Sequence, residues 1–271
     1  MPNLLWFEWE KCPDGYFLDE LKREHVEFIS QNTKRHTAYK TEPTKQAPSW
    51  LADMYDYVGF PYPEIKFGLY IVPKSNRVLR FNPLEEAPAA FMEYGEVTNS
   101  VGSALSFVSK YGRPEIIHNG LYDLPPTALP LNEVQHIATP MAKAIETWNR
   151  AKKNENYREF DNLRFLEDYN NPDHSSFNPR FAHFYGEVSI RLRPNGGRSP
   201  FFAISPNNLT AAMWVQFAQA VSSNTQLRRC AICPNWFSYG TGTGRRTTAD
   251  YCSARCRKAA YQERLKVQQQ K

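Results

Sequence analysis

The spacing of apolar residues along the chain predicts a series of amphipathic helices. Residues three or four positions apart share one helix face, and apolar side chains repeat at that spacing from Asp19 to Gln31 and from Leu131 to Lys152. A further helix is expected after Thr98 and Asn99, either of which can cap its start. It ends at Gly112, where the lack of a side chain suits a left-handed C-terminal cap.

Two stretches in which short apolar runs flank turn-forming residues predict β-hairpins. The first reads FGLYIVPKSNRVLRF, with its turn at residues 73–76. The second reads EVSIRLRPNGGRSPFFAI, with its turn at residues 194–197. The run TEPTKQAPS, which lies ahead of both, has the composition of a linker.

The order of these elements indicates the fold class and the domain organisation. A helix is expected to begin after Asn208 and to lead directly to the clustered cysteines that start at Cys230. Helices and hairpins alternate before that point, so the predicted class is α+β. We expect a larger mixed body over residues 1–225, followed by a small C-terminal module over residues 226–271.

Composition and hydropathy restrict the kind of protein. The chain has 271 residues, of which 14% are aromatic and 23% charged, and this balance is typical of a globular protein. The N-terminal segment carries Glu8 and Glu10 and no basic residue ahead of its apolar patch, so it does not resemble a secretory signal. No apolar stretch reaches the roughly 20 residues that cross a bilayer. We expect a cytoplasmic protein with no membrane partner.

Few residues in the body suggest catalysis. A polar stretch over residues 154–180 is either a loop or a functional lid, and it holds Asp173 and His174, with His183 just beyond. This trio could serve a metal-dependent nuclease, although polar loop residues are usually solvated. The sequence lacks H-E-x-x-H and G-x-S-x-G, and the glycines at Gly240 to Gly244 lack the Lys-Ser/Thr of a P-loop. The chain therefore reads as a binding protein more than as an enzyme.

The cysteines carry the strongest chemical signal. Five are present, and four of them form two close pairs that are separated by 18 residues, whereas Cys12 stands alone. Two such pairs can each supply one edge of a tetrahedral zinc site, and four thiolates leave no open position for catalysis. A redox role for the first pair would need a βαβ context that is missing here. We predict one structural Zn²⁺, with these ligands: Cys230, Cys233, Cys252 and Cys256.

The insert between the two pairs and the segment after it have their own pattern. A strand is expected from Trp236 to Tyr239, with a flexible tip at Gly240 to Gly244 and a return over Arg245 to Tyr251. Ser253 can cap the final helix. On that helix we expect one inward row, which consists of Cys256, Ala260, Glu263 and Val267.

Charge is concentrated in the same C-terminal module. The whole chain has a formal charge of +5, but residues 226–271 hold ten basic residues against two acidic ones, and the rest of the chain is slightly acidic. A field of this kind suits an anionic partner such as nucleic acid, most simply DNA. A solvated helix face, an acidic protein partner and a homo-oligomer remain alternatives. The predicted nucleic-acid-binding residues are Arg228, Arg229, Arg245, Arg246, Arg255, Arg257, Lys258, Arg264 and Lys266.

Two ways of presenting this charge to a duplex are open. The final helix could enter the major groove, with Arg255 and Gln262 as candidate base-reading residues. The hairpin of the module could enter the groove instead. The sequence does not distinguish the two.

The C-terminal quarter resembles a known family. It is similar to the CGNR-type zinc finger of bacterial proteins that carry an N-terminal ABATE domain, and more broadly to treble-clef fingers. In place of the Cys-Gly-Asn-Arg that names the family, this chain has Cys256-Arg257-Lys258-Ala259. The matching residues are Arg229, Cys230, Cys233, Trp236, Phe237, Arg246, Tyr251, Cys252, Ser253 and Cys256.

The resemblance implies a DNA-binding transcriptional regulator whose body, over residues 1–225, acts as a sensor or an assembly unit. Two other functions remain open from the residues alone. One is a protein-interaction adaptor that uses the zinc finger, and the other is a nucleic-acid-processing enzyme with its site in the body.

Overall fold

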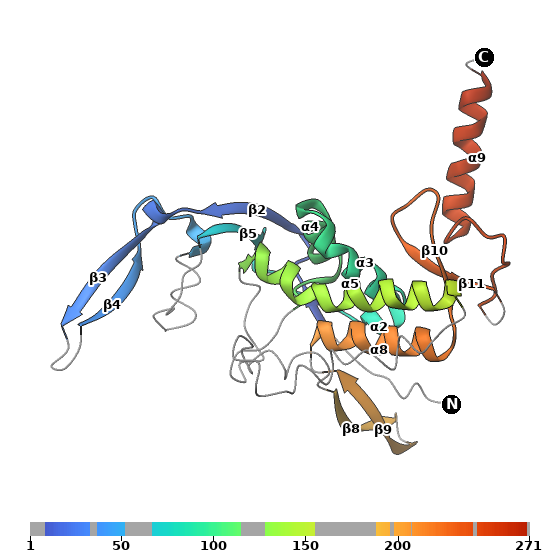
Figure 1. Cartoon of the computed structure of the whole chain (residues 1–271), viewed down its shortest axis with the longest axis horizontal. Coiled ribbons are helices and arrows are strands. Elements are labelled where there is room, and N and C mark those ends of the chain that lie inside the picture. The colour runs from blue at the N-terminus through green and yellow to red at the C-terminus, as the bar shows by residue number, and fades with distance from the viewer. Residues whose placement is uncertain are drawn as a thin grey trace. The chain divides into compact units, whose positions relative to one another are not determined.

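A computed structural model describes residues 9–32, 37–51, 67–114, 128–154, 188–195, 198–206, 208–240 and 243–269. Helices and paired strands alternate along these residues, which confirms the predicted α+β class (Figure 1). The chain divides into two compact units. The first comprises Met1–Trp9, Asn82–Glu96 and Ala138–Lys271, and the second comprises Glu10–Phe81 and Val97–Ile137. The predicted boundary between residues 225 and 226 falls inside the first unit and stays a prediction.

The described strands form one three-stranded sheet and several two-stranded ones. The three-stranded sheet has the order β2-β5-β7, and the pairs are β1-β6, β3-β4, β8-β9 and β10-β11. Their bounds are β1 (Trp9–Lys11), β2 (Tyr16–Leu21), β3 (Val26–Asn32), β4 (Thr37–Pro43), β5 (Gly68–Pro73), β6 (Leu79–Phe81), β7 (Leu129–Pro130), β8 (Val188–Asn195), β9 (Arg198–Pro206), β10 (Gln226–Arg229) and β11 (Trp236–Tyr239).

The helices range from single turns to six or more turns. Among the residues that the structure describes, none of them is both long and apolar enough to cross a membrane. The α-helices are α2 (Pro83–Glu86), α3 (Ala90–Glu96), α4 (Val101–Tyr111), α5 (Leu131–Asn154), α8 (Leu209–Ser222) and α9 (Ala254–Gln269), and the short 3₁₀ helices are η1 (Arg23–His25) and η2 (Val97–Asn99).

The predicted helix over Asp19 to Gln31 is wrong. This segment forms β2, the single turn η1 and β3. β2 pairs along its whole length with β5, and Tyr16 and Leu21 at its two ends are buried. Pairing with a strand some 50 residues away in sequence determines the structure of this segment. The spacing of its own apolar residues carries no information about that partner. The predicted linker also begins as strand, because β4 extends to Pro43.

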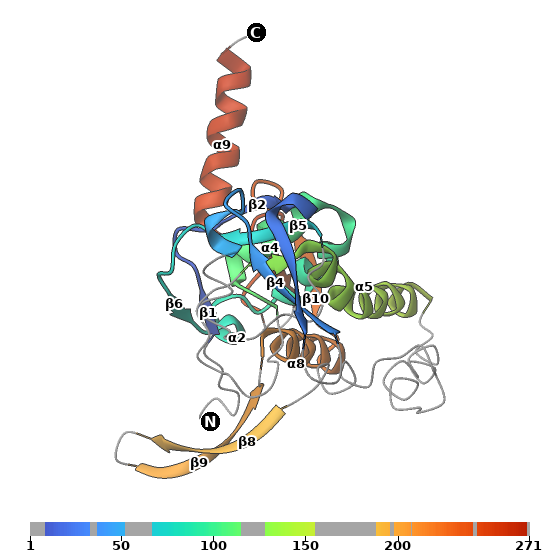
Figure 2. The same cartoon turned by 90° about the vertical axis from the view of Figure 1, so that its left-hand side faces the viewer.

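The first predicted hairpin is wrong in its pairing, although both of its strands exist. β5 lies between β2 and β7, while β6 pairs with β1. β5 buries Tyr70, Ile71 and Val72 in succession instead of alternating, as expected of a strand whose sheet is covered on both faces at this point. The second predicted hairpin is confirmed: β8 and β9 pair antiparallel from Val188↔Pro206 onward (Figure 2).

The remaining predicted helices of the body are confirmed. α5 spans the predicted Leu131 to Lys152 and ends two residues later. α4 ends at Gly112 as expected, although the ψ of −168° at this residue is not that of the predicted left-handed cap. Glycine is needed here because φ is +84° and because a side chain would collide with the backbone of Glu10. The start of α4 differs by one residue, because the cap is Ser100, whose hydroxyl accepts a hydrogen bond from the Ser103 N–H.

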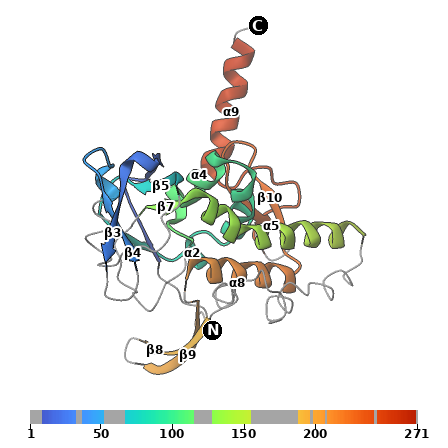
Figure 3. The ribbon, with the colours of Figure 1, turned by 60° about the vertical axis from the view of Figure 1, so that its left-hand side comes forward.

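The core of the first unit lies between α3, α5 and α8, and Figures 1 and 3 show α5 and α8 side by side. The rings of Phe91, Trp148 and Phe217, one from each helix, pack with centroid separations of 5.7 to 6.3 Å. The chain leading into α3 is fixed by buried Gln216. Its Nε2 donates to the carbonyls of Pro83 (2.8 Å) and Ala87 (2.9 Å), and its Oε1 accepts from the Phe91 N–H (3.3 Å).

Substitution of Gln216 tests this clamp. Gln216→Leu keeps the side-chain size but removes three hydrogen bonds from this side chain. The carbonyls of Pro83 and Ala87 each keep one backbone partner, so we expect the free energy of unfolding to fall by roughly 1–3 kcal/mol. Urea denaturation measures the loss. Gln219→Leu, on the exposed side of the same helix, is the control and should stay within about 0.5 kcal/mol of the parent.

Candidate metal centre

The β10–β11 hairpin and the start of α9, both in the first unit, bring the four clustered cysteines together. β10 and β11 pair antiparallel, and Cys230 and Cys233 lie in the turn that connects them. The turn is closed by a hydrogen bond from the Cys230 N–H to the Asn235 carbonyl (3.0 Å). Cys252 precedes α9 and Cys256 lies in its first turn, where the Cys256 N–H donates to the Ser253 hydroxyl (3.3 Å) as predicted for a cap.

The predicted hairpin between the two cysteine pairs is only partly right. The strand Trp236–Tyr239 exists, but it pairs with β10, which precedes the first cysteine. Within the described residues of the insert, the backbone of the returning segment forms a single β-bridge at this strand's end, between Gly240 and Arg245. The first cysteine pair therefore lies inside the hairpin instead of ahead of it. The difference arises because two of the four residues of β10 are arginines, so this strand lacks the apolar pattern from which strands are predicted.

The four sulfur atoms are placed as a metal site requires. All four ligand atoms lie within 4.8 Å of one another. The Sγ–Sγ separations are 3.4 Å for Cys233–Cys252 and 3.6 Å both for Cys252–Cys256 and for Cys233–Cys256. A tetrahedral ion with metal–sulfur bonds of about 2.3 Å has edges of about 3.8 Å, so these spacings fit. They are too long for disulfides, and all four cysteines are free thiols.

The thiol pKa values and the repulsion between neighbouring thiolates both favour binding of a cation by the cluster. Burial alone would raise the pKa of the Cys230 thiol. Backbone N–H groups donate hydrogen bonds to its sulfur, including the Cys252 N–H at 3.4 Å, and they lower the pKa to about 6. Burial and the neighbouring thiols raise the pKa of Cys252 to about 12, and burial also raises the pKa of Cys233. Four thiolates this close repel one another, and a bound cation relieves that repulsion. The residues present thus fit a metal ion.

A glutamate far away in sequence fixes the hairpin to the body of the first unit. Glu96, the last residue of α3, accepts a hydrogen bond from Trp236 Nε1 (3.3 Å) and lies 3.5 Å from the guanidinium of Arg229. Sequence reasoning missed Glu96, because nothing in the local pattern of α3 marks it as a partner of residues more than 130 positions away.

Some of the predicted nucleic-acid-binding arginines already have partners inside the module. Arg228 Nη1 contacts Asp250 (3.0 Å) and the Ala249 carbonyl (3.1 Å), and its guanidinium lies over the Tyr239 ring. Arg245 donates to the carbonyls of Ser238 (3.2 Å) and Cys252 (3.0 Å). Together with Arg229, these residues stabilise the hairpin and the loop that follows it.

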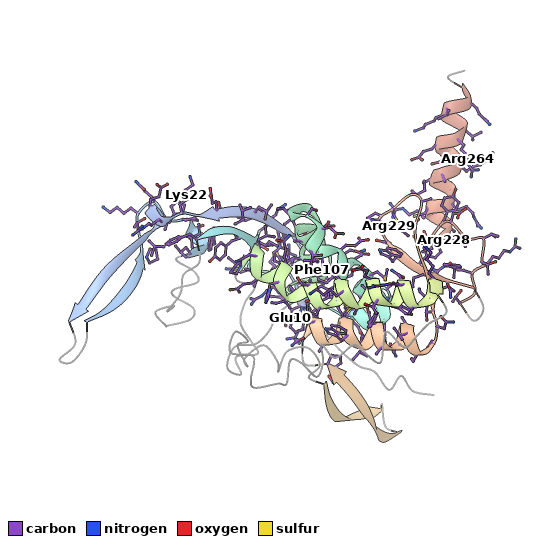
Figure 4. All side chains as sticks on the ribbon, in the orientation of Figure 1. Glu10, Lys22, Phe107, Arg228, Arg229 and Arg264 are labelled. Atoms are coloured by element: carbon purple, nitrogen blue, oxygen red, sulfur yellow. The ribbon has the colours of Figure 1, made fainter. Side chains whose placement is uncertain are left out.

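The other predicted residues are free of such contacts. All six are exposed, and none forms an ion pair with another described residue. Arg264, labelled with Arg228 and Arg229 in Figure 4, hydrogen-bonds only to the Ala260 carbonyl of its own helix. These six residues are Arg246, Arg255, Arg257, Lys258, Arg264 and Lys266.

The predicted inward row of α9 is right near the cysteines and wrong farther along. Ala260 is buried, but Glu263 and Val267 are exposed, the latter to 57%. Beyond Ala260 the module has no side chains to cover the helix, so periodicity there does not produce burial. The three body residues considered for a nuclease, Asp173, His174 and His183, lie outside the described residues.

Comparison with known proteins adds no relative. The chain matches no protein-family model, no curated protein and no solved structure at a significant level.

Proposed function

We propose that residues 226–271 form a zinc finger that binds DNA, and that the chain acts as a transcriptional regulator. The observation that carries the proposal is the combination of a four-cysteine cluster with six exposed basic residues that lack acidic partners among the described residues. The resemblance of the module to CGNR-type, treble-clef fingers of bacterial regulators supports the same function.

Zinc is the metal that suits this site best. Four thiolates at tetrahedral spacing are its preferred structural ligand set in proteins, and no ligand position is left for water or substrate. The ion would supply folding energy and not chemistry. It would join the turn of the β10–β11 hairpin to the start of α9, and so would hold that helix in a fixed orientation on the hairpin.

A nucleic-acid partner follows from the charge. Lysine and arginine side chains that neutralise phosphates release condensed counterions, and this supplies most of the affinity of non-specific binding. Three arginines of the module already have partners inside the protein. These partners are backbone carbonyls and the carboxylates of Asp250 and Glu96. The six others have no such use inside the protein, as expected of a contact surface for an external anion.

The test is a binding titration of the full-length, zinc-loaded chain against duplex DNA over a range of salt concentrations. With four to six phosphate contacts, the logarithm of the association constant should fall against log salt with a slope of about −3.6 to −5.4. Duplex RNA and single-stranded DNA serve as competitors and define the nucleic acid. Affinity that does not change with salt, together with capture of an acidic protein, would instead favour the adaptor function.

A further inference from the structure

The second half of α9 has no protein neighbours among the described residues. Every residue from Tyr261 to Gln268 is exposed, and Figures 1 to 3 show the helix extending away from β10 and β11 of the same unit. An α-helix with its side chains is about 10–12 Å across. The major groove of B-DNA is about 12 Å wide and accepts such a helix, provided that the face turned to the bases is not covered by protein.

The basic residues of α9 lie on two opposite sides of this helix. At 3.6 residues per turn, Arg257 and Arg264 fall on one flank, and Arg255 and Lys266 fall on the opposite flank. A helix in the major groove has one phosphate backbone on each side, so two opposed flanks can each meet one strand. A helix that lies across a single backbone would need its cations on one side only.

Between these flanks runs a strip that points away from the zinc module. It contains Lys258, Tyr261 and Leu265, with Gln262 beside them, whereas Cys256 and Ala260 lie on the other side of the helix. Tyr261 is 58% exposed and Leu265 is 38% exposed. Ammonium and amide groups hydrogen-bond to base edges, and apolar side chains contact the thymine methyl group.

The hairpin is a poorer candidate for entering the groove. The two arginines of the hairpin and Arg245 in the loop after it are held by Asp250, Glu96 and backbone carbonyls. Moving them to phosphates or bases would break these contacts, while the cations of α9 form no ion pair with a described residue. We infer that α9, and not the hairpin, enters the DNA major groove, with Lys258, Tyr261, Gln262 and Leu265 facing the bases. This inference rests on the proposed DNA-binding function.

The experiment separates base reading from phosphate contact. A preferred duplex is first selected from a random pool with the full-length, zinc-loaded chain, and affinity is then compared between that duplex and a shuffled one of equal composition. Tyr261→Ala and Gln262→Ala should each reduce this ratio by about tenfold, with the salt slope unchanged. Val267→Ala is the matched control, because Val267 is equally exposed (57%) but lies on the side of Cys256. It should leave the ratio unchanged.

The other outcomes overturn the inference in distinguishable ways. Salt-dependent binding that is retained by both variants with an unchanged ratio would reject base reading by α9 and leave the proposed function standing. A ratio that falls with Val267→Ala as strongly as with Tyr261→Ala would also reject it. If the parent binds no duplex DNA but does bind vesicles that contain anionic lipid, both the inference and the proposed function fail, and α9 is a membrane-surface helix.

Discussion

Removal of the metal is expected to unfold residues 226–269 while α3, α5 and α8 stay packed. The module buries few apolar side chains of its own, chiefly Cys230, Phe237 and Ala260. Structural zinc contributes about 10–16 kcal/mol to modules of this kind, far more than such a small core can. One zinc per chain should be found by metal analysis. After a strong chelator is added, amide hydrogen exchange should accelerate across β10, β11 and the first turns of α9.

Single cysteine substitutions give the matched comparison. Cys252→Ser removes a ligand that neighbours the other sulfur atoms, so the zinc-binding constant should fall by at least about 100-fold. Cys12→Ser changes a cysteine that is equally free of disulfides but lies outside the cluster. It should keep one zinc per chain. A Cys252→Ser protein that retains stoichiometric metal and slow exchange in the module would contradict the four-cysteine site.

The metal site could be predicted from sequence because its determinants are mostly local. Each cysteine pair lies within five residues, so the chain can close each edge of the tetrahedron without help from distant segments. The same holds for α5, whose apolar stripe repeats over several turns and is buried as expected. Local pattern was sufficient where apolar residues or cysteines repeat at a regular spacing, but not for β10, whose partner β11 is the next element along the chain.

The two strands that were predicted wrongly or missed have separate physical explanations. β2 was predicted as helix because its partner, β5, lies some 50 residues away, and β10 was not recognised because two of its four residues are arginines. A count of charges also treats all arginines alike. It cannot show that Arg229 lies against Glu96 or that Arg228 lies against Asp250, since those contacts depend on how distant elements pack.

Neutralising the flanks of α9 is expected to have the largest effect on DNA binding. Loss of four phosphate contacts reduces the salt slope by about 3.6, which near 0.15 M salt corresponds to a loss of affinity on the order of a thousandfold. Glutamine is nearly as good a helix former as arginine or lysine, so α9 should keep its structure. The substitutions are Arg255→Gln, Arg257→Gln, Arg264→Gln and Lys266→Gln, measured by salt titration of the zinc-loaded chain.

A second variant removes the same number of charges from the body and isolates the effect of position. Its four residues are exposed and lie outside the module, so non-specific attraction falls while the α9 flanks stay intact. It should lose less than about tenfold in affinity and should keep the parent's slope, because none of its four residues lies on α9, where the proposed phosphate contacts are made. Equal losses in the two variants would mean that overall charge, and not α9, attracts the duplex, and would reject α9 as the DNA-contacting element. The control substitutions are Lys45→Gln, Lys74→Gln, Lys143→Gln and Lys153→Gln.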